Sequence, residues 1–356
     1  MENYKEKEHN LINNMKGILI ILVVIGHFIE TTKNKEILFW AKFIYSFHMT
    51  TFILVSGYLA KNFKTNIKNL INLSLLYLTF NTIFRLIFSR KFTFAPFWTL
   101  WYLEALIVYR IILVFINKLK RNQKIKDKMF NGIMIFFIIC SIFISLFGVT
   151  HFTTNSIFNI KTPDIKVIKI SMYLPIFFIG YMISKDNLKK LKEFVNKSVM
   201  GNALVILGII ITFVVNIKYF NNIGIHYLYV NEGYKQWNIT LNQMAFSRFA
   251  AYITGICFSI VVLRVASEKK TKILDNMGEN SLCIFILHTA IVRISRIMIS
   301  EKIINIPAEY ELYYLIIMII LTLLITSNKY VTSLFNKYSN FIKKVSEKID
   351  SKLKLS

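Results

Sequence analysis

An apolar stretch near the N-terminus, residues 15–29, reads MKGILIILVVIGHFI and decides the class of fold. Its length is close to the roughly 20 apolar residues with which a helix crosses a bilayer. Hydrocarbon offers the backbone no hydrogen-bond partners, so such a stretch is stable in a membrane only as a helix. It has no small-residue cleavage site, and we interpret it as a retained helix rather than a signal peptide.

Similar apolar blocks follow along the chain. The 356 residues are 55% hydrophobic and 18% charged, with a mean hydropathy of +0.50, whereas soluble proteins carry about 25% charged residues. The pattern predicts an all-α, polytopic integral membrane bundle of about ten transmembrane helices. The predicted blocks are Met15–Ile29, Leu38–Ala60, Asn69–Phe88, Trp98–Asn117, Met129–Val149, Val167–Ser184, Met200–Tyr219, Leu241–Leu263, Gly278–Ile299 and Glu311–Ser327.

The net charge of +25 comes largely from Lys and Arg residues between the blocks. By direct count, alternate loops starting after the second block hold 18 Lys and Arg, and the other loops, together with Lys169 at the start of the sixth block, hold 9. Basic residues collect on the cytoplasmic side of membrane proteins, so both termini are expected in the cytoplasm. We expect the lipid bilayer, and not nucleic acid, to be the partner of these charges.

The same pattern predicts three parts in a multi-pass protein of the cytoplasmic membrane. They are a cytoplasmic N-terminal segment (1–14), a transmembrane domain (15–330) and a basic cytoplasmic C-terminal tail (331–356).

The cysteines predict neither a disulfide framework nor a metal site. Cys140, Cys257 and Cys283 lie inside apolar blocks, and no pair has metal-ligand spacing. We interpret them as packing residues and expect no bound metal. Ser56 precedes Gly57 but is not in a nucleophile-elbow context, so we also assign it to helix packing.

Six ionisable residues, one in each of six blocks, fall at similar depths when the helical rise is about 1.5 Å per residue. Measured from the cytoplasmic ends of the blocks, they are His27 and His48 at about 18 Å, His288 at about 15 Å, Glu104 at about 20 Å, and Arg85 and Arg248 at about 23–24 Å. Ionisable groups are costly in hydrocarbon, so those that share a depth are expected to face one another or a water-filled cavity. The six residues therefore predict a functional site.

Each of these residues also has a purely structural interpretation. A single His can clamp two helices by hydrogen bonding, Arg85 can extend its side chain to the membrane surface, and Glu104 can pair with Arg248. The remaining histidines lie in the N-terminal segment or in loops, where we expect them to be solvated: His9, His151 and His226.

Four short motifs now point to a family. Lys16 and His27 are separated by ten residues, and the second block contains FHMTTFILVSGY at 47–58. The fourth block contains LWYL at 100–103, and the ninth opens with GENSL and runs to His288 within 278–288. In this order and over nearly the whole chain, the motifs resemble the acyltransferase-3 family of bacterial membrane acyltransferases.

At two positions the sequence departs from the usual pattern of that family, and both departures point to one branch of it. The first motif has Lys16 where Arg is frequent, and Thr50 follows Phe-His-Met where Pro is frequent. Both are similar to the branch of fucose 4-O-acetylases and capsule or exopolysaccharide O-acetyltransferases. Lys16 keeps the positive charge but loses the bidentate geometry of Arg.

The resemblance implies transfer of an acyl group, usually acetyl, from cytoplasmic acyl-CoA to a hydroxyl of a cell-surface or exported glycan. Acetyl-CoA or another acyl-CoA is then a donor substrate rather than a bound cofactor, and the acceptor is a glycan or a lipid-linked saccharide. His27 is the candidate general base and Glu104 the candidate group that orients it. The candidates for binding donor or acceptor are Lys16, His48, Arg85, Trp101, Arg248 and His288.

Several alternatives stay open from the sequence. A covalent acyl-histidine could carry the acyl group in two steps. A polytopic transporter or flippase for a glycan or lipid-linked substrate also places charges within helices, although the chain lacks paired Gly/Pro-interrupted helices and has only 4 Pro. An assembly subunit without turnover is the third alternative.

Overall fold

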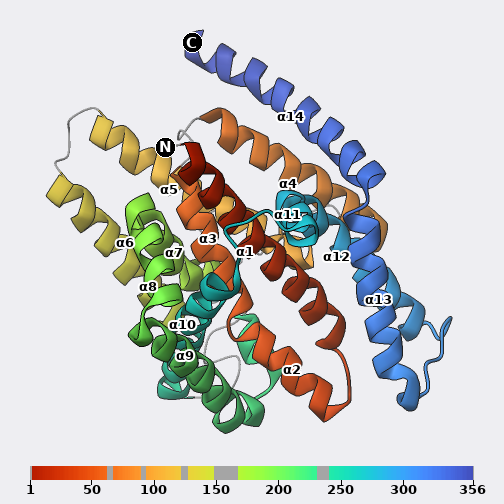
Figure 1. Ribbon diagram of the computed structural model, residues 1–356. Helices are drawn as coiled ribbons and strands as arrows, with labels where there is room; N and C mark the ends of the chain where they lie inside the picture. The colour runs from red at the N-terminus through yellow and green to blue at the C-terminus, as the bar shows by residue number, and fades with distance from the viewer. Residues whose placement is uncertain are drawn as a thin grey trace. The chain divides into compact units, whose positions relative to one another are not determined.

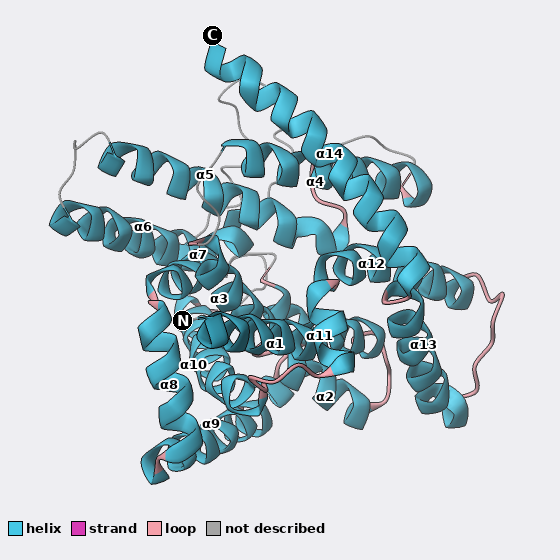
Figure 2. Cartoon of the chain, turned by 45° about the horizontal axis from the view of Figure 1, so that its top comes forward, coloured by secondary structure: helices cyan, strands magenta, loops and turns pink. Residues whose placement is uncertain are grey.

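The computed structural model describes residues 2–61, 67–89, 94–121, 127–147, 167–230 and 240–355. Within these ranges every regular element is a helix, and Figure 2 shows helices and loops without a strand. The predicted all-α class is confirmed. His151 lies outside the described residues.

Fourteen α-helices and four short 3-10 helices follow one another along the described chain (Figure 1). They are α1 (Glu2–Ile29), α2 (Lys35–Tyr45), α3 (His48–Ala60), α4 (Ile67–Phe88), η1 (Trp98–Leu100), α5 (Trp101–Arg121), α6 (Asp127–Phe147), α7 (Val167–Met182), α8 (Lys185–Lys197), α9 (Val199–Lys218), η3 (Phe220–Asn222), η4 (Ile225–Tyr229), α10 (Leu241–Val265), α11 (Lys272–Glu279), α12 (Ser281–Ser300), η5 (Ala308–Tyr310), α13 (Glu311–Thr326) and α14 (Lys329–Leu355).

Each predicted apolar block contains a helix, and among the described residues eight spans are long and apolar enough to cross a membrane. A ninth is possible if α7 and α8, which meet at an angle of 94°, count as one broken span. The apolar part of α6, Met129–Ser145, is shorter than these spans. The chain is therefore a multi-pass membrane protein with eight or nine spans in its described part, close to the predicted number.

Two predicted blocks are interrupted, and helix α1 extends far beyond its block. The second block contains α2 and α3, which are separated at Ser46 and Phe47, and the ninth begins in α11 and breaks at Asn280 before α12. Helix α1 begins at Glu2 and is continuous with the first block. Residues 2–14 and the apolar block 15–29 are therefore parts of a single helix.

The helices divide into two compact units. Unit 1 comprises Met1–Val55, Ile183–Tyr229 and Phe249–Phe335, and unit 2 comprises Ser56–Met182, Val230–Arg248 and Asn336–Ser356. Each unit draws on segments that are far apart in the sequence, so long-range contacts between helices define both.

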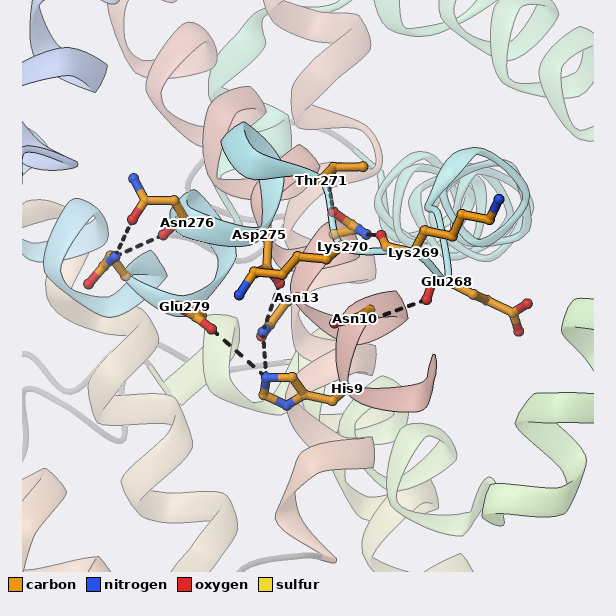
Figure 3. Close-up of polar contacts among 12 residues, drawn as sticks. His9, Asn10, Asn13, Glu268, Lys269, Lys270, Thr271, Asp275, Asn276 and Glu279 are labelled. Atoms are coloured by element: carbon orange, nitrogen blue, oxygen red, sulfur yellow. Dashed lines mark hydrogen bonds and ion pairs between the residues drawn. The ribbon is translucent and has the colours of Figure 1, made fainter. Parts of the chain in front are cut away.

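In unit 1, α1 and α11 lie side by side (Figure 1), and their backbones approach closely at two glycines. A Cβ added at Gly17 would overlap the carbonyl of Leu274, and one added at Gly278 would overlap the carbonyl of Asn13. The Asn13 amide also donates to Asp275 at 3.3 Å. Figure 3 shows the side chains of α1 facing the segment that contains α11. Glycine at these two positions permits the close approach.

Replacing Gly17 by alanine is expected to destabilise unit 1 by about 1–3 kcal/mol, the usual cost of overpacking. Gly132→Ala in α6 is the matched control, because no atom lies within 4 Å of the added Cβ. Alanine in an open helical position is expected to be neutral or to stabilise by about 0.5–1 kcal/mol. Thermal unfolding in detergent measures both effects, and an unchanged midpoint for Gly17→Ala would contradict the packing described.

The amphipathic helix α8 is joined to the end of α10 by a buried lysine in unit 1. The Lys192 ammonium donates to the carbonyls of Leu263, Arg264 and Ala266 at 2.7, 3.2 and 2.7 Å. These carbonyls belong to the last turn of α10 and to Ala266, the residue after it, where helices leave acceptors unsatisfied. Lys192 therefore acts as a side-chain cap between two helices.

In unit 2, α3, α5 and α7 approach closely. A Cβ at Gly57 would overlap the carbonyl of Phe177, and the Tyr109 hydroxyl donates to Ile170 O at 2.6 Å. The C-terminal part of α14 contacts α4, where the Tyr338 hydroxyl donates to Thr79 at 2.8 Å. The three cysteines are free thiols within α6, α10 and α12; Cys283 is buried, and Cys140 and Cys257 are partly exposed.

Candidate active site

Three of the predicted histidines come together in unit 1. The rings of His27 on α1 and His288 on α12 stack with centroids 5.4 Å apart and planes inclined by 27°. Tyr45 on α2 packs edge-on against both His27, at 5.8 Å, and His48, at 4.9 Å. Residues from four helices therefore form one buried aromatic cluster, which we call the histidine cluster: His27, Tyr45, His48 and His288.

A hydrogen-bond relay fixes the tautomer of His27. The Tyr45 hydroxyl lies 2.8 Å from His27 Nδ1, and the same hydroxyl donates to a carboxylate oxygen of Glu30. A hydroxyl has one proton to donate, so Tyr45 must accept from His27 Nδ1–H. The proton of the neutral imidazole is therefore on Nδ1, and the basic lone pair is on Nε2.

Glu30 is the negative charge at the end of this relay. Its side chain is 4% exposed, and one carboxylate oxygen lies 3.5 Å from His27 Nδ1. Arg296 on α12 also pairs with this carboxylate, and its Nη2 donates to the carbonyl of His27 at 2.6 Å. Burial disfavours ionisation of Glu30, but the interactions with His27, Arg296 and Tyr45 outweigh it and lower the pKa of Glu30 to about 2. Glu30 is therefore a carboxylate at neutral pH.

In both His48 and His288, Nδ1 is hydrogen-bonded to the main-chain carbonyl four residues earlier. His48 Nδ1 lies 2.7 Å from Ile44 O, and His288 Nδ1 lies 3.0 Å from Ile284 O. A carbonyl can only accept, so each Nδ1 carries a proton. The tautomers of the three histidines are thus set by fixed partners.

Lys16 occupies another part of α1. It precedes His27 by eleven residues, which is about 16 Å along a helix. Its neighbours are acidic, since Glu279 and Asp275 lie within electrostatic reach. The structure thus places Lys16 beside α11 and outside the histidine cluster.

The other predicted residues lie in unit 2, around two tyrosines. Glu104 and Arg85 are both within electrostatic reach of Tyr77. Trp101 stacks on Tyr173 with ring centroids 5.5 Å apart, and Arg248 is within electrostatic reach of the same tyrosine. The predicted site residues are therefore divided between the two units.

Arg85 and Trp101 have partners that the sequence alone did not indicate. Arg85 Nε donates to Ala95 O at 2.9 Å and holds the loop that precedes α5. The Lys169 ammonium lies 4.5 Å from the centroid of the Trp101 ring, a cation–π contact. Ser56 on α3 is hydrogen-bonded to Tyr102 on α5 at 2.6 Å.

Comparison with known proteins identifies the family. A family model described as an acyltransferase domain, that of the acyltransferase-3 family, matches residues 9–327. The chain belongs to this acyltransferase family. With its apolar helices, it is a membrane acyltransferase.

A short segment of the acyltransferase is also similar to a curated protein. Nodulation protein NolL of Sinorhizobium fredii (strain NBRC 101917 / NGR234) is 49% identical to it over 51 residues, which are 13% of this chain and 14% of NolL. The similarity therefore covers a small part of either protein. No solved structure matches the acyltransferase.

Three residues of the acyltransferase were missed by reasoning from sequence. Glu30 lies just beyond the first apolar block, but it is three residues after His27 and hence on the same helical face. Arg296 lies eight residues after His288, about two helical turns. Tyr45 lies two positions before Phe47, the first residue of the Phe-His-Met motif. Helical spacing could have indicated Glu30 and Arg296, whereas nothing in the sequence connected Tyr45 with His27.

The arrangement in unit 1 is suited to proton transfer. A histidine with its tautomer fixed by a neighbouring group and a carboxylate behind that group is the usual pairing of a base with a residue that orients it. Among the described residues, no three His, Cys, Asp or Glu side chains are placed to hold a metal ion.

Proposed function

We propose that this membrane acyltransferase moves an acyl group, acetyl in the first instance, from cytoplasmic acyl-CoA to a hydroxyl of a cell-surface or exported glycan. The observation that carries the proposal is the relay from His27 through Tyr45 to Glu30. Family membership supports acyl transfer. The relay supports a reaction in which a weakly acidic hydroxyl must lose a proton.

In the proposed reaction, the acceptor hydroxyl attacks the thioester carbonyl of acyl-CoA. His27 Nε2 takes the hydroxyl proton as the C–O bond forms, and the resulting imidazolium is stabilised through Tyr45 by the Glu30 carboxylate. The C–S bond then breaks, and the CoA thiolate takes the proton from His27. The products are an O-acyl ester and free CoA, and the enzyme returns to its starting protonation state.

Arg296 has a positioning role in this scheme. It holds both the Glu30 carboxylate and the main-chain carbonyl of His27. The base and the carboxylate are therefore fixed by one guanidinium, whose planar geometry suits two simultaneous hydrogen bonds.

The proposed donor and acceptor are supported by the sequence rather than by the geometry. The basic loops and Lys16 favour a donor that carries phosphates on the cytoplasmic side. The likeness to the O-acetyltransferase branch, through Lys16 and Thr50, favours a sugar hydroxyl as acceptor.

The proposal is tested with the purified full chain in liposomes, radiolabelled acetyl-CoA and a panel of candidate glycans. We expect label in the glycan as a base-labile ester. Label on the protein without acceptor would favour the covalent acyl-histidine. Movement of glycan across the bilayer without label would overturn the proposal in favour of a transporter or flippase.

A further inference from the structure

His288 has a buried ring nitrogen that no residue of the described chain satisfies. Its side chain is fully buried, and Nδ1 is 3.0 Å from Ile284 O in the preceding turn of α12. Nε2 has no hydrogen-bond partner among the described residues. Buried polar atoms are nearly always hydrogen-bonded, so an exception calls for an explanation.

The chemistry of this nitrogen defines what it can bind. Because Nδ1 donates its proton to Ile284 O, Nε2 carries a lone pair and can only accept. Among the described residues, no group around the ring supplies a donor to this nitrogen. His27 stacks against one face, and Phe285 lies with its ring centroid at 5.7 Å. The Glu30 carboxylate, which is within electrostatic reach, has no proton to give. A complementary ligand must therefore bring an O–H or N–H group.

The position beside His27 narrows the choice of ligand. The two imidazoles are nearly parallel with centroids 5.4 Å apart, so both rings lie within the span of one ligand of the size of a sugar. A hydroxyl has only one proton, and in the proposed reaction the proton of the attacking hydroxyl goes to His27. His288 must then engage a second donor close to the first. Two adjacent hydroxyls on one sugar ring meet this requirement.

We propose that His288 Nε2 accepts a hydrogen bond from the sugar hydroxyl adjacent to the one that is acylated, so that the acyltransferase selects acceptors with a vicinal diol. The inference rests on the proposed function, because it assigns the second hydroxyl of the same acceptor. His288 is in this account a residue for binding and regioselectivity, and His27 remains the base.

The test pairs a protein variant with a substrate variant. His288→Asn keeps an amide donor near Nδ1 for Ile284 O but has no acceptor at the position of Nε2, whereas His288→Gln places a carbonyl oxygen near that position. The probes are methyl hexopyranosides with vicinal hydroxyls and their monodeoxy forms, each lacking one hydroxyl next to the acetylated one. Transfer from radiolabelled acetyl-CoA is measured as kcat and KM.

For the wild-type enzyme, a sugar that lacks the adjacent hydroxyl is expected to have a KM about 10-fold higher than the intact sugar. This factor corresponds to the contribution of one hydrogen bond. In His288→Asn the KM for the intact sugar should rise by a similar factor and the deoxy sugar should bind no worse than the intact one. His288→Gln should recover part of the discrimination. The KM for acetyl-CoA should not change.

Two outcomes overturn the inference while leaving the proposed function intact. One is a wild-type KM that is insensitive to the adjacent hydroxyl, and the other is a His288→Asn enzyme that still discriminates as the wild type does. If His288→Asn fails to fold, the wild-type comparison of intact and deoxy sugars decides alone. A wild-type enzyme that labels no sugar overturns the proposed function itself.

Discussion

Replacing His27 by alanine is expected to lower the rate of acyl transfer by about 10²- to 10⁴-fold, the usual contribution of a general base. The tautomer of His27 is set through Tyr45 and Glu30, and its Nε2 lone pair is the proposed proton acceptor. Without this lone pair, the attacking hydroxyl keeps its proton until late in the reaction. The measurement is the initial rate of transfer of label from acetyl-CoA by the purified protein.

The matched control for this variant is His9→Ala. His9 lies on the same helix, but its side chain is 64% exposed and it contacts Asn13 and Glu279 at the other end of α1 (Figure 3). It should retain wild-type activity. Comparable rates for His27→Ala and wild type, at equal amounts of folded protein, would exclude His27 as the base.

Replacing Glu30 by glutamine is expected to lower kcat by about 10- to 100-fold, because a hydrogen bond to a charged group contributes about 1.5–3 kcal/mol. Glutamine keeps the size of the side chain but removes the charge that stabilises the imidazolium form of His27. Since Glu30 acts through His27, the KM values for donor and acceptor should change little. Steady-state kinetics with each substrate varied in turn provide this separation.

Glu104→Gln is the informative comparison. The sequence made Glu104 the candidate for orienting the base, whereas the structure places Glu30 on the relay to His27 and Glu104 near Tyr77 in unit 2. We expect Glu30→Gln to show the greater loss of kcat. A large loss in Glu104→Gln together with normal turnover in Glu30→Gln would return the orienting role to Glu104.

The positions of the helices could be predicted from the sequence because block length and hydropathy reflect a simple requirement of the bilayer. The break between α2 and α3 could not, because its stabilisation comes from distant residues. Ser46 at the break accepts hydrogen bonds from Asn216, through its hydroxyl, and from Thr254, through its carbonyl. These partners are 170 and 208 residues away in the sequence.

Part of the candidate site could also be predicted from the sequence. Depth along a helix is readable from sequence, and it drew attention to His27, His48 and His288, which the structure brings together. Rotation about the helix axis and the pairing of helices are not readable in this way. The contact of Arg296 with Glu30 therefore appears only in the folded chain.

The central claim is that Glu30 supports catalysis through His27, and a double-mutant cycle tests it most directly. Transfer rates are measured for the wild type, His27→Ala, Glu30→Gln and the double variant. Residues that act as a unit have non-additive effects, so the double variant is predicted to be no slower than His27→Ala alone. If the two losses multiply, Glu30 acts independently of His27 and the relay does not operate in catalysis.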